Sequence, residues 1–247
     1  MGPAAASISA ALCFFGGATN AIAGGGTLIV FPGLIALGLS AVPANVTNTV
    51  AMTAGYLGGA RAQRAALAAY RGRLRSLVLT ATAGGVVGAG LLLETNDQSF
   101  YRAVPYLVLF ACALLAAQNF IKRRLVTGSA GLGPWMLPCV FAASVYGGYF
   151  GAGLGILLLA ILGVGLEGDL AAINAVKQVL SLVVNFVAAI AFCLSGKVVW
   201  ALVPLMAVGG YLGGHFGGKL VGRLDAAKLR AVVCCAGVVV AVTMWLR

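Results

Sequence analysis

A short glycine-rich break followed by an apolar stretch occurs twice in the chain. The copies are Gly24-Gly25-Gly26-Thr27 followed by LIVFPGLIALGL, and Gly151-Ala152-Gly153-Leu154 followed by GILLLAILGVGL. They lie about 127 residues apart, roughly half the chain, which indicates a duplication. As helices, residues 27–39 and 154–166 would be about 20 Å long, too short for a hydrocarbon core of about 30 Å. Each is therefore predicted to begin near mid-membrane, at its glycine break.

The composition places the chain in a membrane. Of its 247 residues, 62% are hydrophobic and 9% are charged, whereas soluble domains have about 25% charged residues. We therefore predict an all-α polytopic membrane protein with a single transmembrane domain over residues 1–247. The net charge of +11 is also typical of nucleic-acid binders, but the basic residues lie in short connections between apolar runs. Membrane orientation explains them better, and no nucleic-acid partner is expected.

About ten apolar segments follow one another along the chain, five in each half. The fourth segments carry matching glycine motifs, AGGVVG at 83–88 and VGGYLG at 208–213. We therefore divide the chain into repeat 1, residues 1–124, and repeat 2, residues 130–247. The predicted segments cover residues 4–23, 25–39, 43–60, 74–93 and 101–121 of the first half and residues 133–150, 153–166, 170–194, 198–217 and 228–246 of the second.

The basic residues predict the orientation of these segments, because cytoplasmic loops are enriched in Lys and Arg. The connection before the fourth segment is rich in arginine in the first half (61–75), but its counterpart holds only Lys197. The next connection reverses this bias, being acidic in the first half (94–97) and basic in the second (219–230). With residues 122–124, 12 of the 16 basic residues then lie inside. The two repeats are thus predicted to be inverted, with both termini outside.

Two helix N-termini that meet at mid-membrane form a natural anion site. A helix N-terminus carries unpaired N–H groups and a partial positive charge, and glycine lets a ligand approach the backbone closely. Inversion is predicted to bring the N-termini at Gly24–Thr27 and Gly151–Leu154 face to face. The simpler alternative is that the glycines only allow a turn or tight helix packing. Their occurrence at matching positions in both halves favours the anion site.

The segment after each short helix carries a stripe of polar residues. Lys177 is the most informative of them, because a charge inside an apolar segment costs at least about 2.5–3.5 kcal/mol. We expect it to face a cavity, a partner or a ligand; the alternatives are that it snorkels to the cytoplasmic surface or pairs with Glu167 or Asp169. The stripe residues are four apart and so share one helical face in each half: Asn45, Thr49 and Thr53, and Lys177, Ser181 and Asn185.

Other conspicuous residues indicate packing rather than chemistry. The single histidine, His215, lies in the run GGYLGGHFGG, where a tight helix contact explains it better than a proton relay. Glycines four apart in the fourth segments (Gly84 and Gly88, Gly209 and Gly213) indicate close helix crossings. The six cysteines lie in apolar runs without metal-ligand spacing and are interpreted as small hydrophobic residues. No enzyme motif is present, so we expect no catalysis, cofactor or metal.

These motifs, in their order, resemble one known family. IAGGGTLIVFPGLIALGLS followed by PANVTNTVA, then YGGYFGAGLG and FCLSGKVVWALVPLMAVGGYLGGHFGGKLVGRLDAAKLR, are similar to the TauE/SafE or sulfite exporter family of bacterial and archaeal inner-membrane transporters. The resemblance covers essentially the whole chain. It implies a multi-pass inner-membrane protein that exports or takes up small anions, chiefly sulfur oxyanions and organosulfonates.

The resemblance also implies site residues. The family often has asparagines three and seven residues after its polar lysine, but here those positions are Leu180 and Val184. Ser181 and Asn185, one residue further on, are candidates to take their place. This departure bears on the substrate more than on the fold. Carried over by position, the family's glycines, Thr-Asn pair and lysine fall on Gly24, Gly25, Gly26, Thr47, Asn48, Gly151, Gly153 and Lys177.

The residues thus predict an inverted-repeat secondary transporter that moves a small anion by alternating access, and the resemblance implies that this anion is a sulfur oxyanion or organosulfonate. A coupling ion, H⁺ or Na⁺, and a homodimer formed through small-residue faces are both compatible with the pattern. The rival interpretations are a passive anion channel, a membrane scaffold subunit and a cation transporter, the last of which fits badly with Lys177. The expected binding residues are Gly24, Gly25, Gly26, Thr27, Thr47, Asn48, Thr49, Thr53, Gly151, Gly153, Lys177, Ser181 and Asn185.

Overall fold

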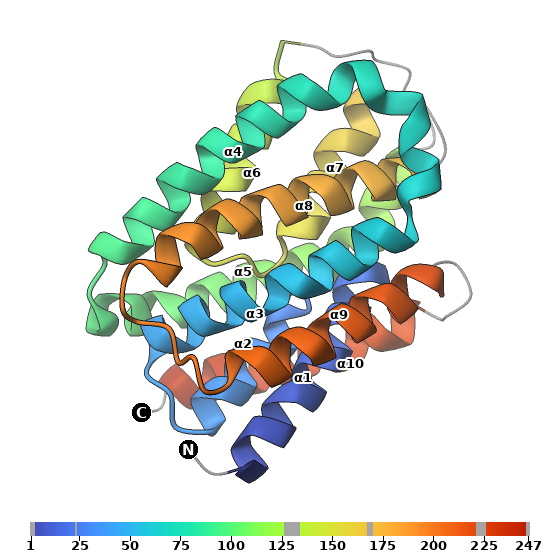
Figure 1. Cartoon of the computed structure of the whole chain (residues 1–247). Coiled ribbons are helices and arrows are strands. Elements are labelled where there is room, and N and C mark those ends of the chain that lie inside the picture. The colour runs from blue at the N-terminus through green and yellow to red at the C-terminus, as the bar shows by residue number, and fades with distance from the viewer. Residues whose placement is uncertain (1–2, 23, 126–133, 167–169, 221–225, 246–247) are drawn as a thin grey trace.

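The computed structural model describes residues 3–22, 24–125, 134–166, 170–220 and 226–245 of the chain. Glu167 and Asp169, considered above as partners of Lys177, lie outside these ranges. The described residues are helical apart from short connections and contain no strand (Figure 1). Their helices are α1 Pro3–Ile22, α2 Thr27–Ala36, α3 Ala41–Ala62, the 3₁₀ helix η1 Arg64–Tyr70, α4 Arg71–Glu94, α5 Asp97–Leu125, α6 Met136–Tyr149, α7 Leu154–Gly165, α8 Leu170–Cys193, α9 Val203–Lys219 and α10 Ala226–Trp245.

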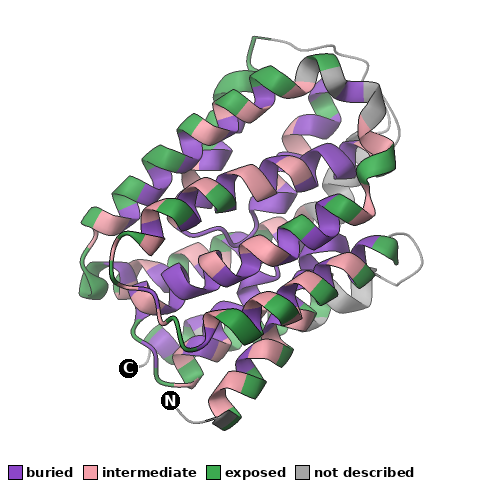
Figure 2. Cartoon of the chain, viewed as in Figure 1, coloured by how far each residue is buried: buried purple, intermediate pink, exposed green. Residues whose placement is uncertain are grey.

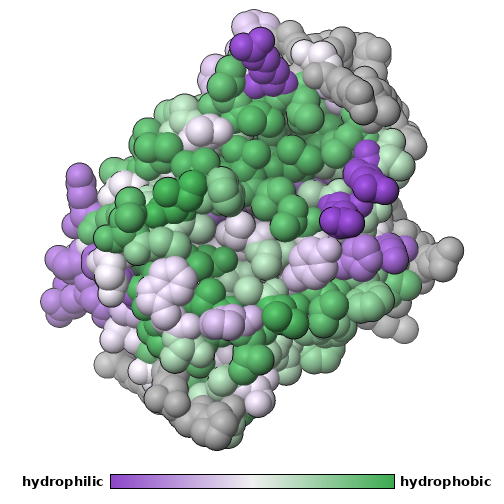
Figure 3. Space-filling view, in the orientation of Figure 1, coloured by the Kyte–Doolittle hydropathy of each residue, from purple (hydrophilic) through white to green (hydrophobic). Residues whose placement is uncertain are grey.

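The helices make a membrane protein, as predicted. The surface is mainly hydrophobic, and hydrophilic side chains gather toward the ends of the molecule (Figure 3). α3 has 22 residues, but its polar side chains lower its hydropathy, and most of them are buried inside the bundle. The prediction of an all-α polytopic membrane protein is therefore confirmed. Four described helices are long and apolar enough to cross a membrane, over Ala4–Ile22, Leu74–Glu94, Asp97–Ala117 and Ala171–Cys193.

Each of the ten predicted segments corresponds to one α-helix, with shifts of a few residues at the ends. The ninth helix begins at Val203 instead of residue 198, because residues 198–202 form hydrogen-bonded turns. The short helices are shorter than predicted, with 10 residues in α2 and 12 in α7. α2 ends early because Gly38 takes a left-handed conformation with φ of 91°, which is a common way for a helix to end.

Glycines on α9 let this helix press directly against backbone of the first half. Gly213 lies against the Phe14 carbonyl of α1, and Gly214 lies against the backbone of Gly55 in α3. A side chain at either position would overlap these atoms, so the predicted close helix crossings are confirmed. The same two rows continue along α9, with contacts to α1 at Gly209 and Gly217 and to α3 at Gly210 and Gly218.

α4 makes the corresponding contacts with the second half. Gly84 and Gly88 lie against backbone atoms of α6, and Gly85 lies against Val184 of α8. The fourth helix of each half thus packs against the other half: α9 packs on α1 and α3, and α4 packs on α6 and α8 (Figure 1). These contacts follow the predicted pairing of the two glycine motifs. The opposite orientation of repeats 1–124 and 130–247 in the membrane stays a prediction.

The single histidine belongs to the same packed contact. The His215 ring stacks on Tyr211, with centroids 6.1 Å apart. Its backbone nitrogen lies 3.0 Å from the position that a Cβ on Gly58 of α3 would take. The structure therefore agrees with a packing role for this residue.

The connections gather at two ends of the bundle. In Figure 1, η1 and the end of α9, which carry Arg64 and Lys219, lie at the right, whereas the connections at residues 94–97 and 193–203 lie at the left. Asp97 in the left-hand group accepts the Val42 N–H at 2.8 Å and so holds the start of α3. The arginine-rich connection at 61–75 and the acidic connection at 94–97 thus lie at opposite ends of the bundle.

Replacing Gly213 by Ala should destabilise the protein, because the new Cβ would overlap the Phe14 carbonyl and force α9 away from α1. Overpacking of this kind costs about 1–3 kcal/mol. Gly90→Ala in α4 is the matched control, since nothing lies within 4 Å of a Cβ added there. Thermal unfolding in detergent should give a lower Tm for Gly213→Ala and an equal or higher Tm for Gly90→Ala. Equal Tm values for the two variants would contradict the contact.

Candidate functional site

Both predicted breaks are present, and both depend on glycine. Between α1 and α2, Gly24 and Gly25 have φ of 79° and 97°, and between α6 and α7, Gly151 and Gly153 both have φ of 82°. Residues with a side chain rarely adopt this left-handed conformation. Figure 2 shows the connections at both breaks buried in the middle of the bundle. The repeated glycines therefore meet the same backbone requirement in each half.

The two breaks lie against each other. A Cβ on Gly24 would be 3.2 Å from the Ile156 side chain and 3.4 Å from its backbone nitrogen, so the first break contacts the first turn of α7. The hydroxyl of Thr27, the first residue of α2, is 4.0 Å from the position of a Cβ on Gly151. From this meeting point α2 leads toward the lower part of Figure 1 and α7 toward the upper part. The N-termini of the two short helices thus come together inside the protein.

Asparagines from the opposite half bind the carbonyls at the ends of the interrupted helices. Asn45 Nδ2 in α3 donates to the Tyr149 carbonyl at the end of α6, at 3.0 Å. Asn174 Nδ2 in α8 donates to the Ala21 carbonyl at the end of α1, at 3.5 Å. The last carbonyls of a helix have no partner within that helix. Each half therefore supplies a hydrogen bond that the other half lacks.

Lys177 lies at the meeting point of the breaks. Its Nζ donates to the carbonyl of Asn20 in the last turn of α1, at 3.2 Å. Its Cδ and Cε lie 3.6 and 3.7 Å from the position of a Cβ on Gly155, along the first turn of α7. With 2% of its surface exposed, the lysine is inside the protein as expected. It does not snorkel to the surface.

Asn20 is a central residue that sequence reasoning missed. Its Oδ1 accepts the backbone N–H of Gly26 at 2.6 Å, and its carbonyl accepts the Lys177 ammonium. It thereby joins the end of α1, the start of α2 and α8. The sequence signal for it is an amide side chain four residues before a glycine break in an apolar run. One consequence is that an N–H at the N-terminus of α2 already has a partner.

The register of α3 against α8 determines which glycine break each predicted binding residue lies near. The Thr53 hydroxyl donates to the Asn185 carbonyl at 3.3 Å, and Asn174 donates to Gln63 at 2.6 Å, so the two helices run antiparallel. Lys177 therefore lies level with the end of α3, near the first break. Asn48 and Thr49 lie toward the start of α3, on the side of Asn45 and the second break. Thr53 and Asn185 lie level with each other between the breaks, and Ser181 lies one turn from Lys177 on α8.

Four other predicted residues make contacts of a different kind. Thr47 points to the connection before α9, where its hydroxyl accepts the Val199 N–H at 3.0 Å. Gly25 and Gly153 pack on side chains of α5, and Gly26 packs on the backbone of α1. These residues shape the breaks and the helix contacts.

Several buried polar atoms near the breaks have no hydrogen-bond partner among the described residues. They include Ser181 Oγ, one turn from Lys177, and Asn45 Oδ1 and Asn48 Oδ1 near the second break. Leaving such an atom unpaired costs about 1–3 kcal/mol, so a ligand, an ion or water that bonds to these atoms would remove this cost. The Ser181 hydroxyl can donate a hydrogen bond, which suits an anion. The two amide oxygens can only accept, which suits a cation or water.

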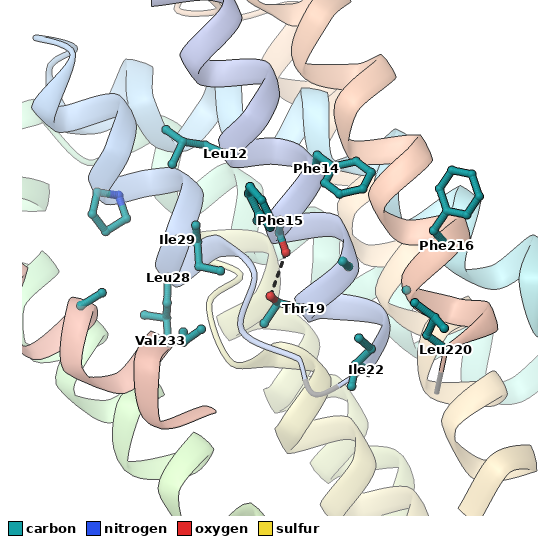
Figure 4. A pocket seen from close by; sticks show the side chains of 14 residues that line it. Leu12, Phe14, Phe15, Thr19, Ile22, Leu28, Ile29, Phe216, Leu220 and Val233 are labelled. Atoms are coloured by element: carbon teal, nitrogen blue, oxygen red, sulfur yellow. Dashed lines mark hydrogen bonds between the residues drawn. The ribbon is translucent and has the colours of Figure 1, made fainter. Parts of the chain in front are cut away.

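A surface groove lies apart from these residues, between α1, α2, α9 and α10, with a volume of about 600 Å³. Figure 4 shows its apolar lining, including Leu12, Leu28 and Leu220. The hydroxyl of Thr19 is turned to the Phe15 carbonyl, at 2.8 Å. The lining includes none of the predicted binding residues and offers nothing to hold an anion.

Comparison with known proteins identifies the family. The sequence profile described as "Sulfite exporter TauE/SafE" matches residues 9–244, a range that includes both breaks and Lys177. The chain belongs to the TauE/SafE family. This membership confirms the resemblance drawn from the glycine and polar motifs.

Curated relatives of this TauE/SafE chain are named as transporters. "Probable membrane transporter protein YfcA" of Escherichia coli is 29% identical over 217 residues, which are 83% of this chain and 76% of the relative. A "Probable membrane transporter protein" of Haemophilus influenzae is 25% identical over 221 residues, 87% of this chain and 84% of the relative. No solved structure matches the chain. The protein is therefore a membrane transporter of the TauE/SafE type, and its relatives are named as transporters rather than enzymes.

Replacing Asn20 by Ala should destabilise the protein, because the Gly26 N–H would be left buried without its partner. A loss of this kind costs about 1–3 kcal/mol. Thr19→Ala is the matched control, since Thr19 is as deeply buried but its hydroxyl bonds only within its own helix. Thermal unfolding in detergent should show a clearly larger drop in Tm for Asn20→Ala. Similar drops for both variants would mean that Asn20 does not bridge the break.

Proposed function

We propose that this TauE/SafE protein is a secondary transporter that moves a small anion, a sulfur oxyanion or organosulfonate, across the bacterial inner membrane by alternating access. The observation that carries the proposal is the buried Lys177 ammonium between the end of α1 and the start of α7. A charge inside the membrane costs at least about 2.5–3.5 kcal/mol. An anion bound beside Lys177 offsets this cost.

In this proposal the anion binds among donors near the first break. These are the Lys177 ammonium, the Ser181 hydroxyl and the N-terminal turn of α7. A sulfite or sulfonate group has three oxygens and accepts from several donors at once, whereas a carboxylate has two. This supports a sulfur oxyanion as the substrate class.

The closed site supports alternating access. Asn20, Lys177 and Ser181 are each at most 4% exposed, so a substrate there needs a path that opens. The short helices α2 and α7 meet at the site and lead toward different ends of the bundle (Figure 1). Movement at either short helix would open the site toward one face at a time, which is how broken-helix transporters work.

Replacing Lys177 by Gln should weaken anion binding by at least about tenfold, or 1.4 kcal/mol, because it keeps a donor for the Asn20 carbonyl but removes the charge. Lys197→Gln is the matched control, since Lys197 Nζ also donates to a helix-end carbonyl, that of Leu93, at 3.4 Å. Sulfite, sulfate, thiosulfate, sulfoacetate, taurine and simple carboxylates would be screened by thermal shift and then titrated.

The expected pattern is selective stabilisation of the wild type by a sulfur oxyanion or sulfonate. This stabilisation should be retained in Lys197→Gln and lost in Lys177→Gln. Equal binding by the two variants would remove Lys177 from the site. Stabilisation by carboxylates alone would contradict the proposed substrate class.

A coupling cation near the second break is the second part of the proposal. Asn45 Oδ1 and Asn48 Oδ1 are buried acceptors one turn apart on α3, and Asn45 also binds the end of α6. Amide and carbonyl oxygens bind Na⁺ in broken-helix transporters. Because amides do not titrate near neutral pH, this arrangement favours Na⁺ over H⁺ as the coupling ion.

Sodium chloride should therefore raise the Tm of the wild type more than choline chloride at the same concentration. The difference should vanish in Asn48→Ala and persist in Lys177→Gln, whose change lies near the other break. A wild-type Tm that does not distinguish the two salts would argue against a Na⁺ site.

Uptake into proteoliposomes separates the proposed transporter from its rivals. A transporter accumulates a labelled sulfonate against its gradient when a counter-gradient is imposed, whereas a passive anion channel only equilibrates it. A scaffold subunit moves none. The homodimer stays a prediction from the small-residue faces, and the molar mass in detergent would test it.

A further inference from the structure

Two cysteines from different halves of the chain meet where α5 packs against α10. Cys112 Sγ lies 3.8 Å from the Cys234 carbonyl oxygen, and Cys234 Sγ lies 3.5 Å from the Cys112 carbonyl oxygen. Each thiol reaches the backbone of the other residue, so both side chains cross the same gap at the same level. Gly237, one turn further along α10, makes room for Cys112, because a Cβ there would be 2.6 Å from its sulfur.

The turn of α5 that holds Cys112 also supports both glycine breaks. A Cβ on Gly153 would be 3.3 Å from the Ala111 Cβ, and a Cβ on Gly25 would be 3.5 Å from the Leu115 side chain. The neighbouring α10 also packs against α2. The Cys112–Cys234 contact is therefore made on the same turn of α5 that contacts both breaks.

We propose that Cys112 and Cys234 are a redox-active dithiol that closes to a disulfide on oxidation and ties α10 to this turn of α5. The oxidant is a small neutral peroxide, which can enter an apolar helix contact. One thiol cleaves the O–O bond, becomes a sulfenic acid and releases one water. The second thiol then displaces the hydroxyl, so that the S–S bond forms and a second water leaves. Two electrons pass to the peroxide, and both thiol hydrogens end in the waters.

The disulfide restricts movement of the chain at the breaks. It joins the helix that contacts both breaks to the helix that contacts α2, so it limits any movement of the short helices against each other. Formation of the disulfide does not depend on the transported substrate. Only an effect on transport would rest on the proposed function.

The test uses the detergent-purified full chain, treated with hydrogen peroxide or Cu(II)-phenanthroline. Wild type should lose two maleimide-reactive thiols and yield a linked Cys112–Cys234 fragment by mass spectrometry, and a phosphine reductant should reverse both changes. Cys112→Ala should yield no such fragment. Cys235→Ala is the matched control, because Cys235 is adjacent to Cys234 but exposed, and it should behave like wild type. Hydrogen exchange in peptides that contain the breaks should slow by about fivefold or more in the oxidised wild type.

Absence of the linked fragment, or equal thiol loss in Cys112→Ala and Cys235→Ala, would overturn the dithiol. A linked fragment with unchanged hydrogen exchange at the breaks would overturn its coupling to them. Both readouts are independent of anion binding. A failure of the proposed transport function is therefore distinguishable from a failure of this inference.

Discussion

The requirement that backbone polar groups inside a membrane find partners governs this structure. Two helical segments are interrupted in the middle of the bundle, where the membrane supplies no water to bind the exposed N–H and C=O groups. Asn45 and Asn174 bind the carbonyls at the ends of α6 and α1, and Asn20 binds an N–H at the start of α2. Polar side chains are therefore required at the breaks on structural grounds. The candidate site is built from the same chemistry.

The hydrogen bonds to the carbonyls at the breaks depend on how the two halves pack against each other. Asn45 and Asn174, which bind the carbonyls of the interrupted helices, come from the opposite half, and so does the fourth helix that packs on each interrupted helix. Glycine rows let α9 pack directly on the backbones of α1 and α3, and α4 on those of α6 and α8. Close packing of small residues is a main source of helix association in lipid, where apolar side chains gain little from leaving the solvent.

Corresponding residues lie near the two breaks, and the proposed site depends on one difference between them. Asn48 and Lys177 occupy the same position in α3 and α8, seven residues after the first residue of each helix. One is a neutral amide with an unpaired oxygen, and the other is a buried ammonium. The proposal of an anion near one break and a coupling cation near the other follows from this difference. A symmetric pair of residues would offer no such separation of charge.

The sequence by itself determined the membrane class, the ten α-helices of the described ranges and the two glycine breaks, because hydropathy and runs of glycine are local properties of the chain. It also favoured an interior position for Lys177 over one at the surface, which the 2% exposure of this residue bears out. Only the tertiary structure decided that Asn20 bridges a break, that Thr47 binds the connection before α9, and that Cys112 meets Cys234. These outcomes depend on how helices distant in sequence are registered against each other. That register follows from glycine contacts and cross-half hydrogen bonds, which a helical period does not specify.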